Sequence, residues 1–133
     1  HTPLLNQMLV YEYIKRYDFN AHIEDGCRLY GEKCALMISC MDKYFPKCVS
    51  YTHPDGGIFL WCTMPEGADS KVLFEKSIAS KVAFVPGSTC MTDIEAPSNC
   101  FRLNYSTADN DDIEKGIKIL GGLLCDMFGG QNL

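Results

Sequence analysis

Apolar residues recur at helical spacing in four stretches of the chain, and the stretches between them alternate or form short apolar runs. The helical spacing predicts helices over about residues 3–17, 20–44, 70–80 and 110–128. The remaining pattern predicts strands over about residues 49–52, 57–63, 82–85 and 100–105. Such a mixture of elements is typical of a two-layer α+β domain, a small and mostly antiparallel sheet with helices packed on one face.

Polar residues mark several of the expected boundaries. Asn20 is a candidate N-cap for the second helix, Asp69 or Ser70 for the third, and Asp109 for the fourth. The segment 53–56, His-Pro-Asp-Gly, has the chemistry of a tight hairpin between the first two strands.

The first predicted helix has no clear polar side. Its apolar residues spread around most of its circumference, at positions 4, 5, 8–11, 13 and 14. A helix that is apolar all round is normally buried on several sides, and a domain of this size offers few sides. We therefore expect a partner surface for this helix.

Length and charge narrow the class of protein. The 133 residues suffice for one domain, and 47% hydrophobic with 22% charged residues is an ordinary globular composition. A net charge of −5 without a basic run argues against nucleic-acid binding, and no apolar stretch is long enough to cross a bilayer. The chain begins with His1 rather than Met, as expected for a piece of a longer protein.

Cysteine and histidine spacing indicates no metal centre. The eight cysteines contain no CxxC pair, and they are expected to be reduced core thiols of a cytosolic protein. His1, His22 and His53 lie on three separate segments, with no spacing that would join them as ligands. No nucleophile elbow or phosphate-binding loop occurs either.

Arg102 is the one candidate ligand-binding residue. It lies in the apolar strand Cys-Phe-Arg-Leu, where alternation places Arg102 and Asn104 on one face and Phe101 and Leu103 on the other. A guanidinium binds a planar carboxylate through two parallel hydrogen bonds. The alternative is a structural ion pair between Arg102 and an acidic residue at the sheet edge.

Gly56 and Gly57 form a second candidate feature. A hairpin that needs a positive φ accounts for one of the two glycines. The other, at the start of a strand, weakens that strand and suggests close approach of another group to the backbone.

Three segments in order resemble the class I/II aminotransferases of fold type I. They are Pro54–Trp61 (PDGGIFLW) with Pro65 after it, Val82–Ser88 (VAFVPGS), and Phe101–Ser106 (FRLNYS). The resemblance extends over nearly all 133 residues and implies the C-terminal small domain of such an enzyme. Residues 1–17 would be an interdomain-type helix and residues 18–133 the small domain.

This resemblance implies a function for the whole enzyme. It would use pyridoxal 5'-phosphate (PLP) to move an amino group between an amino acid of the 2-aminoadipate, aromatic or branched-chain type and a 2-oxo acid. Arg102 would bind the substrate α-carboxylate, with Gly56 and Gly57 in a structural turn nearby. The family often has consecutive arginines in the second helix, where this chain has Lys33 and Cys34.

The resemblance also implies what this chain leaves to other parts of the protein. The lysine that bonds PLP, the aspartate at its ring nitrogen and the phosphate-binding loop belong to the family's large domain. The chain alone is therefore expected to hold no catalytic residue, to bind no PLP and to be inactive. Its partners would be the large domain of the same chain, the substrate and a second subunit in a homodimer.

Two other functions remain open at this point. The chain also resembles the aminotransferase-like half of bacterial regulators that carry a DNA-binding helix-turn-helix, and a winged helix-turn-helix upstream would decide for that function. A free-standing α+β domain that binds a small ligand is the other, and a genuine start codon just before His1 would favour it.

Overall fold

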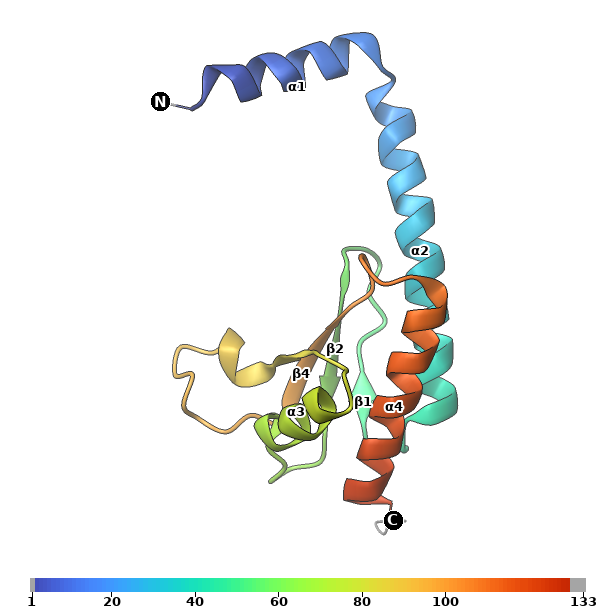
Figure 1. Ribbon diagram of the computed structural model, residues 1–133, viewed down its shortest axis with the longest axis vertical. Coiled ribbons are helices and arrows are strands. Elements are labelled where there is room, and N and C mark those ends of the chain that lie inside the picture. The colour runs from blue at the N-terminus through green and yellow to red at the C-terminus, as the bar shows by residue number, and fades with distance from the viewer. Residues whose placement is uncertain (1, 130–133) are drawn as a thin grey trace.

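Four α-helices and four short strands make up residues 2–129, the part of the chain that the computed structural model describes (Figure 1). Along the chain they run as α1 (Leu4–Arg16), α2 (Phe19–Tyr44), β1 (Ser50–Tyr51), β2 (Phe59–Thr63), α3 (Ser70–Ala79), β3 (Val85–Pro86), the 3-10 turn η1 (Gly87–Cys90), β4 (Cys100–Asn104) and α4 (Asn110–Phe128). The types and order of the elements agree with the sequence pattern.

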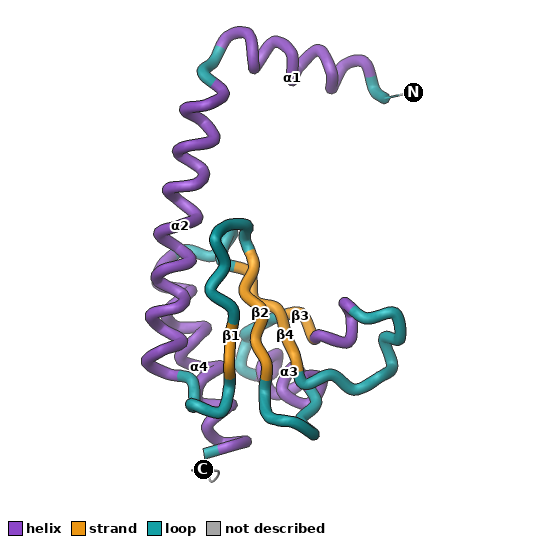
Figure 2. Tube along the Cα trace, turned by 180° about the vertical axis from the view of Figure 1, so that it is seen from behind, coloured by secondary structure: helices purple, strands orange, loops and turns teal. Residues whose placement is uncertain are grey.

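The strands form one antiparallel sheet in the order β1-β2-β4-β3. The register places Trp61 of β2 and Val85 of β3 on either side of Arg102. In Figure 2 the strands lie in front of α3 and α4, so the helices cover one face of the sheet. This arrangement confirms the predicted two-layer α+β fold.

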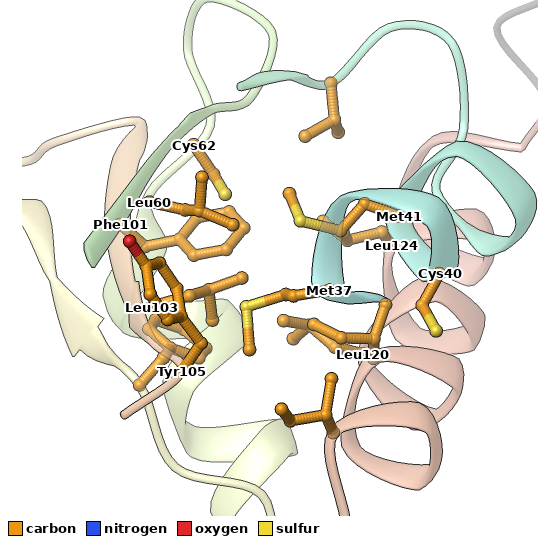
Figure 3. Packing of buried hydrophobic residues seen from close by; sticks show 14 of the residues in the cluster. Met37, Cys40, Met41, Leu60, Cys62, Phe101, Leu103, Tyr105, Leu120 and Leu124 are labelled. Carbon is orange, nitrogen blue, oxygen red and sulfur yellow. The ribbon is translucent and has the colours of Figure 1, made fainter. Parts of the chain in front are cut away.

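The hydrophobic core lies between the sheet, α4 and the C-terminal half of α2 (Figure 3). The predicted apolar stripe of α4 is buried, with Leu120 and Leu124 at 0% exposure. α4 approaches α2 closely at Gly121, where a Cβ atom would lie 2.5 Å from the carbonyl oxygen of Tyr44. Burial of each large apolar side chain stabilises the fold by about 1.5–3 kcal/mol. This packing therefore holds the sheet in position against the helices.

Aspartate side chains cap three of the helices. Asp69 and Asp109 accept hydrogen bonds from the backbone amides at the starts of α3 and α4, as expected. The prediction for α2 is wrong by two residues: Asp18, not Asn20, is the N-cap, and its Oδ1 accepts from the amide of Ala21 at 3.0 Å. Asp is as good a cap as Asn, so the choice depends on where the chain turns out of α1.

The connection between β1 and β2 is not a tight hairpin. The amide of Thr52 donates to the carbonyl of Trp61 at 2.9 Å, and residues 53–58 then form a wide loop. Pro54 has no amide to offer a strand ladder, and Gly57 turns the chain with φ at 89°.

The third strand lies further along the chain than the sequence predicts. Lys81 follows α3 with a positive φ of 63°, and the amide of Val82 donates back to the carbonyl of Ser77 at 2.8 Å. Residues 82–84 therefore lie in the connection between α3 and β3. Pairing with β4 begins only at Val85.

The helix α1 and the first part of α2 extend away from the sheet (Figure 1). α1 has no buried residue, and the buried residues of α2 begin at Cys34. The exposed side chains include Leu4, Leu5 and Leu9, each more than 60% accessible. Within the described residues, no helix has the length and hydrophobicity needed to cross a membrane.

All eight cysteines are free thiols. Three of them are buried in the core, Cys34, Cys40 and Cys62, and burial raises the pKa of the Cys62 thiol. Cys100 is half-buried, and Cys27, Cys48, Cys90 and Cys125 are exposed. The expectation of core thiols therefore holds for only part of the set.

Candidate functional site

The sheet has one face against the helices and one open face. On β4, Phe101 and Leu103 are buried, whereas Arg102 is half-buried and Asn104 is exposed. Side chains of successive residues point to opposite faces, so Arg102 and Asn104 share the open face, as predicted. This face is toward the viewer in Figure 2.

The guanidinium of Arg102 rests on an aromatic ring. Its Cζ lies 4.1 Å from the centroid of the Phe59 ring. Phe59 belongs to β2, where it pairs with Asn104, two register positions away from the Trp61–Arg102 pair and therefore on the same face. A cation over a ring is held electrostatically, and the ring fixes the plane of the guanidinium while leaving its N–H edges free.

Arg102 has no acidic partner among residues 2–129. The salt bridges of these residues involve Arg16, Arg28 and Lys71, all with exposed carboxylates. The Nε of Arg102 is buried and donates to no acceptor within the described chain. This geometry contradicts the alternative in which Arg102 forms a structural ion pair at the sheet edge.

A buried cationic donor without a partner is costly, because water has been removed and nothing replaces it. Arg102 as a whole is only half-buried, and its guanidinium is therefore suited to an anion from outside the described residues. A planar carboxylate fits best, since it accepts two parallel N–H bonds.

Gly56 and Gly57 lie in the wide loop at the end of β2 nearest Phe59. Gly57 has a φ of 89°, which explains why a glycine occupies this position. One of the two glycines was predicted to need a positive φ. The Tyr105 hydroxyl donates to the Gly57 carbonyl at 2.9 Å and fastens the loop to the end of β4. A Cβ atom at Gly56 would meet nothing within 4 Å, so close backbone approach at Gly56 stays a prediction.

Both glycines also line a groove of about 960 Å³ between the loop and α2. Its other walls are largely apolar and include Ile23, Tyr30 and Tyr105. Arg102 does not line this groove, so the structure does not bring the arginine and the two glycines into one pocket.

Tyr105 is a buried titratable residue that lines this groove. Burial, with a hydrogen bond to Cys34, raises the pKa of Tyr105 to about 12. The phenol therefore stays protonated near neutral pH and can donate to the Gly57 carbonyl.

Histidine and acidic residues form no second site in the described part of the chain. His22 and His53 lie on separate elements, and no group of three potential metal ligands occurs among residues 2–129. His1 lies outside the described residues.

Sequence reasoning missed two residues, Phe59 beside Arg102 and Lys33 beside the loop that follows β4. Phe59 could have been found by aligning β2 and β4, because the register brings its face to that of Arg102. Lys33 gave no such signal: it lies on α2, and its Nζ donates to the carbonyls of Ser106 and Ala108 at 3.0 and 2.6 Å.

Comparison with known proteins shows which proteins this chain is similar to. The chain is 40% identical over 124 residues to a 2-aminoadipate transaminase of Thermus thermophilus, covering 93% of this chain and 31% of that protein. It is 32% identical to an aromatic-amino-acid aminotransferase of Thermococcus litoralis, over 90% of this chain and 28% of that protein. No protein-family model matches.

A solved structure shows the same fold. The α-aminoadipate aminotransferase of Thermus thermophilus, crystallised with N-(5'-phosphopyridoxyl)-L-leucine, superposes with a TM-score of 0.88 at 38% identity, over 97% of this chain and 33% of that chain. The chain belongs to the fold-type-I aminotransferases.

Within that family the chain corresponds to the C-terminal small domain. It spans about 30% of the length of the aminotransferases it matches. Helix-turn-helix transcriptional regulators also match, at 27% identity or less, so the similarity does not favour the regulator alternative.

Proposed function

We propose that this small domain is part of a cytoplasmic, PLP-dependent aminotransferase that moves an amino group between an amino acid and a 2-oxo acid. The observation that carries the proposal is the unpaired guanidinium of Arg102 on the open face of the sheet, held over Phe59 with its Nε buried. Similarity to enzymes named for 2-aminoadipate and aromatic amino acids supports the reaction class. Eight free thiols fit a reducing compartment.

Arg102 would bind the substrate by its α-carboxylate. Two parallel hydrogen bonds from the guanidinium to the carboxylate oxygens fix both the position and the rotation of that group. Because the carboxylate is bonded to Cα, fixing it also places Cα, and only rotation about the bond between them is left to set the direction of the Cα–H and Cα–N bonds. The contribution of Arg102 is therefore orientation, and no bond to hydrogen or nitrogen is made or broken by this residue.

Arg102 provides a binding group for the substrate carboxylate, but the same face of the sheet carries no lysine that could bond the cofactor. None of the nine lysines lies on β1–β4, so no ammonium shares the sheet with Arg102. PLP, where the whole enzyme binds it, supplies the electron sink of transamination. We expect the groups that hold it to come from the rest of the enzyme.

Amino acids of the 2-aminoadipate, aromatic or branched-chain type are the proposed donors. The α-carboxylate is common to all of them, so Arg102 alone does not select a side chain. Selection would come from groups outside the carboxylate site.

The proposed partner of the exposed helix α1 is the large domain of the same chain. α1 carries apolar side chains on all sides and buries none of them against residues 2–129. The relatives are about three times as long as this chain, which provides the material for such a partner. Covering these side chains would stabilise the assembly by about 25 cal/mol per Å² of apolar area. A homodimer of the whole enzyme is proposed from the resemblance.

The experiment is steady-state kinetics on the whole enzyme with 2-aminoadipate, an aromatic and a branched-chain amino acid. Arg102→Lys keeps the charge and loses the bidentate fork, so kcat/KM should fall by about 100-fold for every donor. Arg102→Ala should fall further. Phe101→Leu, a buried neighbour on the opposite face, is the matched control and should stay within about threefold.

Two outcomes would reject the proposal. One is a whole protein without aminotransferase activity on any of these donors. The other is near-normal kcat/KM in Arg102→Lys, which would contradict the carboxylate-binding role of Arg102.

For the isolated chain, incubation with PLP, borohydride trapping and peptide mapping should show no single lysine labelled stoichiometrically.

A further inference from the structure

We propose that Lys33 is a positioning residue that holds Arg102 in its carboxylate-binding place. The proposal rests on the function proposed above. Lys33 lies on α2, in the half that packs into the body of the domain, and is partly buried. Its ammonium donates to the carbonyl oxygens of Ser106 at 3.0 Å and Ala108 at 2.6 Å, 73 and 75 residues away along the chain.

These two carbonyls belong to the loop that joins β4 to α4. A charged donor makes hydrogen bonds about twice as strong as neutral ones, and a single ammonium here bridges both ends of a short loop. Asp109, the N-cap of α4, follows directly after this loop. Lys33 therefore fixes the loop to α2 at the point where the chain leaves the strand that carries Arg102.

The loop is in turn fastened to the open face of the sheet. The Oδ1 of Asn104 accepts from the amide of Ser106 at 2.7 Å and from its hydroxyl at 2.8 Å. Asn104 lies two residues after Arg102 on the same face and pairs with Phe59. Phe59 is the residue whose ring lies under the guanidinium.

Lys33 thus reaches Arg102 by a continuous path of hydrogen bonds and strand pairing. The path runs from the ammonium to Ser106, then to Asn104, and from there along β4 to Arg102 and across to Phe59. Without Lys33 two carbonyls would lose a cationic donor, and the end of β4 would be free to shift. A small displacement suffices, since carboxylate binding by a guanidinium depends on the position and plane of both groups.

The test uses the whole enzyme and separates positioning from folding. Lys33→Met removes the donor and keeps the length of the side chain. The KM for the amino acid, and the inhibition constant of a simple carboxylate that competes with it, should both rise by about tenfold or more. The value of kcat should change by less than either. Lys43→Met, on the same helix but solvent-exposed, is the matched control and should leave all three constants unchanged.

Two further variants make the result decisive. Lys33→Arg restores a cationic donor and should recover most of the affinity for the carboxylate. If Lys33→Met does not fold, Lys33→Gln, which keeps a neutral donor, takes its place with the same expected direction. Unchanged KM and inhibition constant in the folded variant would overturn the proposal. So would a fall in activity that only follows the folded fraction measured by circular dichroism.

Arg102→Lys in the same experiment distinguishes the two proposals. If Arg102→Lys loses kcat/KM while Lys33→Met matches the unmodified enzyme, only the role of Lys33 is rejected. If Arg102→Lys is also unaffected, the carboxylate site itself is rejected, and the role of Lys33 with it.

Discussion

The two faces of the sheet are built from alternate residues of the same strands, yet they are organised by different interactions. On the inner face Leu60, Cys62 and Phe101 have no exposed surface and belong to the hydrophobic core. On the outer face Arg102 is half-buried over Phe59, which keeps 40% of its surface exposed. The inner face is complete within this chain, whereas the outer face has a buried donor that finds no acceptor in residues 2–129.

This contrast separates stability from binding. Inner-face residues contribute free energy of folding because burial removes their apolar surface from water. Arg102 contributes little to the free energy of folding, because its charge is partly dehydrated and its buried donor is unpaired. Its interaction energy remains available for a ligand, as expected of a residue that serves recognition.

Truncating Phe101 and Arg102 tests this contrast on neighbouring residues, and we expect the largest effect on stability here. Phe101→Ala removes a fully buried ring and should lower the free energy of unfolding of the chain by about 3–5 kcal/mol. Arg102→Ala removes an unpaired donor and should change it by about 0.5 kcal/mol or less. Urea unfolding followed by circular dichroism measures both.

A milder variant covers the case in which Phe101→Ala does not fold. Phe101→Leu keeps an apolar side chain and should cost about 1–1.5 kcal/mol. A loss of more than about 2 kcal/mol in Arg102→Ala would contradict the comparison, because it would mean that Arg102 is held by a partner within the chain.

Much of the inner face was predictable from the sequence. The spacing of Ile113, Ile117 and Leu120 specifies a helix with one buried side, and the alternation around Arg102 specifies which strand residues face the core. Burial depends on the type and period of residues, which a sequence displays directly. The fold class followed from these periods.

The surroundings of Arg102 depended on contacts between distant segments. Phe59 and Arg102 meet through the β2–β4 register, and Lys33 meets Ser106 through the packing of α2 on the sheet. No local spacing encodes these contacts. The misplaced N-cap at Asn20 and the misplaced third strand have a related cause, since both boundaries were decided by how the chain turns between elements.

The two loop glycines provide a second, smaller comparison. Gly57 adopts a φ of 89°, which a residue with a Cβ adopts only under strain, whereas Gly56 does not have a positive φ. Gly57→Ala should therefore lower the free energy of unfolding by about 1–2 kcal/mol, and Gly56→Ala by about 0.5 kcal/mol or less. Thermal unfolding of both variants in one buffer checks this order. Equal losses would show that the loop does not depend on the positive φ at Gly57.

The Tyr105 hydroxyl connects the inner face to that loop, and its removal should have a smaller effect near neutral pH than truncation of Phe101. Tyr105→Phe keeps the buried ring and loses the hydrogen bond to the Gly57 carbonyl, which should cost about 1 kcal/mol at pH 8. Tyr11→Phe, on the exposed helix α1, is the matched control and should cost about 0.5 kcal/mol or less at this pH.

The same variant should also alter how stability depends on pH. Burial raises the pKa of Tyr105 to about 12 from an ordinary value of 10.0, so the folded state holds this proton more tightly than the unfolded state. Its contribution is fully present below pH 10 and is lost as the pH rises from 10 to about 12. Tyr105→Phe has no such proton to lose, so the difference in unfolding free energy between the two proteins should narrow over that interval. Urea titrations at several pH values between 8 and 12 measure this difference. A constant gap would show that the Tyr105 phenol ionises as easily in the folded domain as in the unfolded chain, and a widening gap that it ionises more easily there; either would contradict the raised pKa.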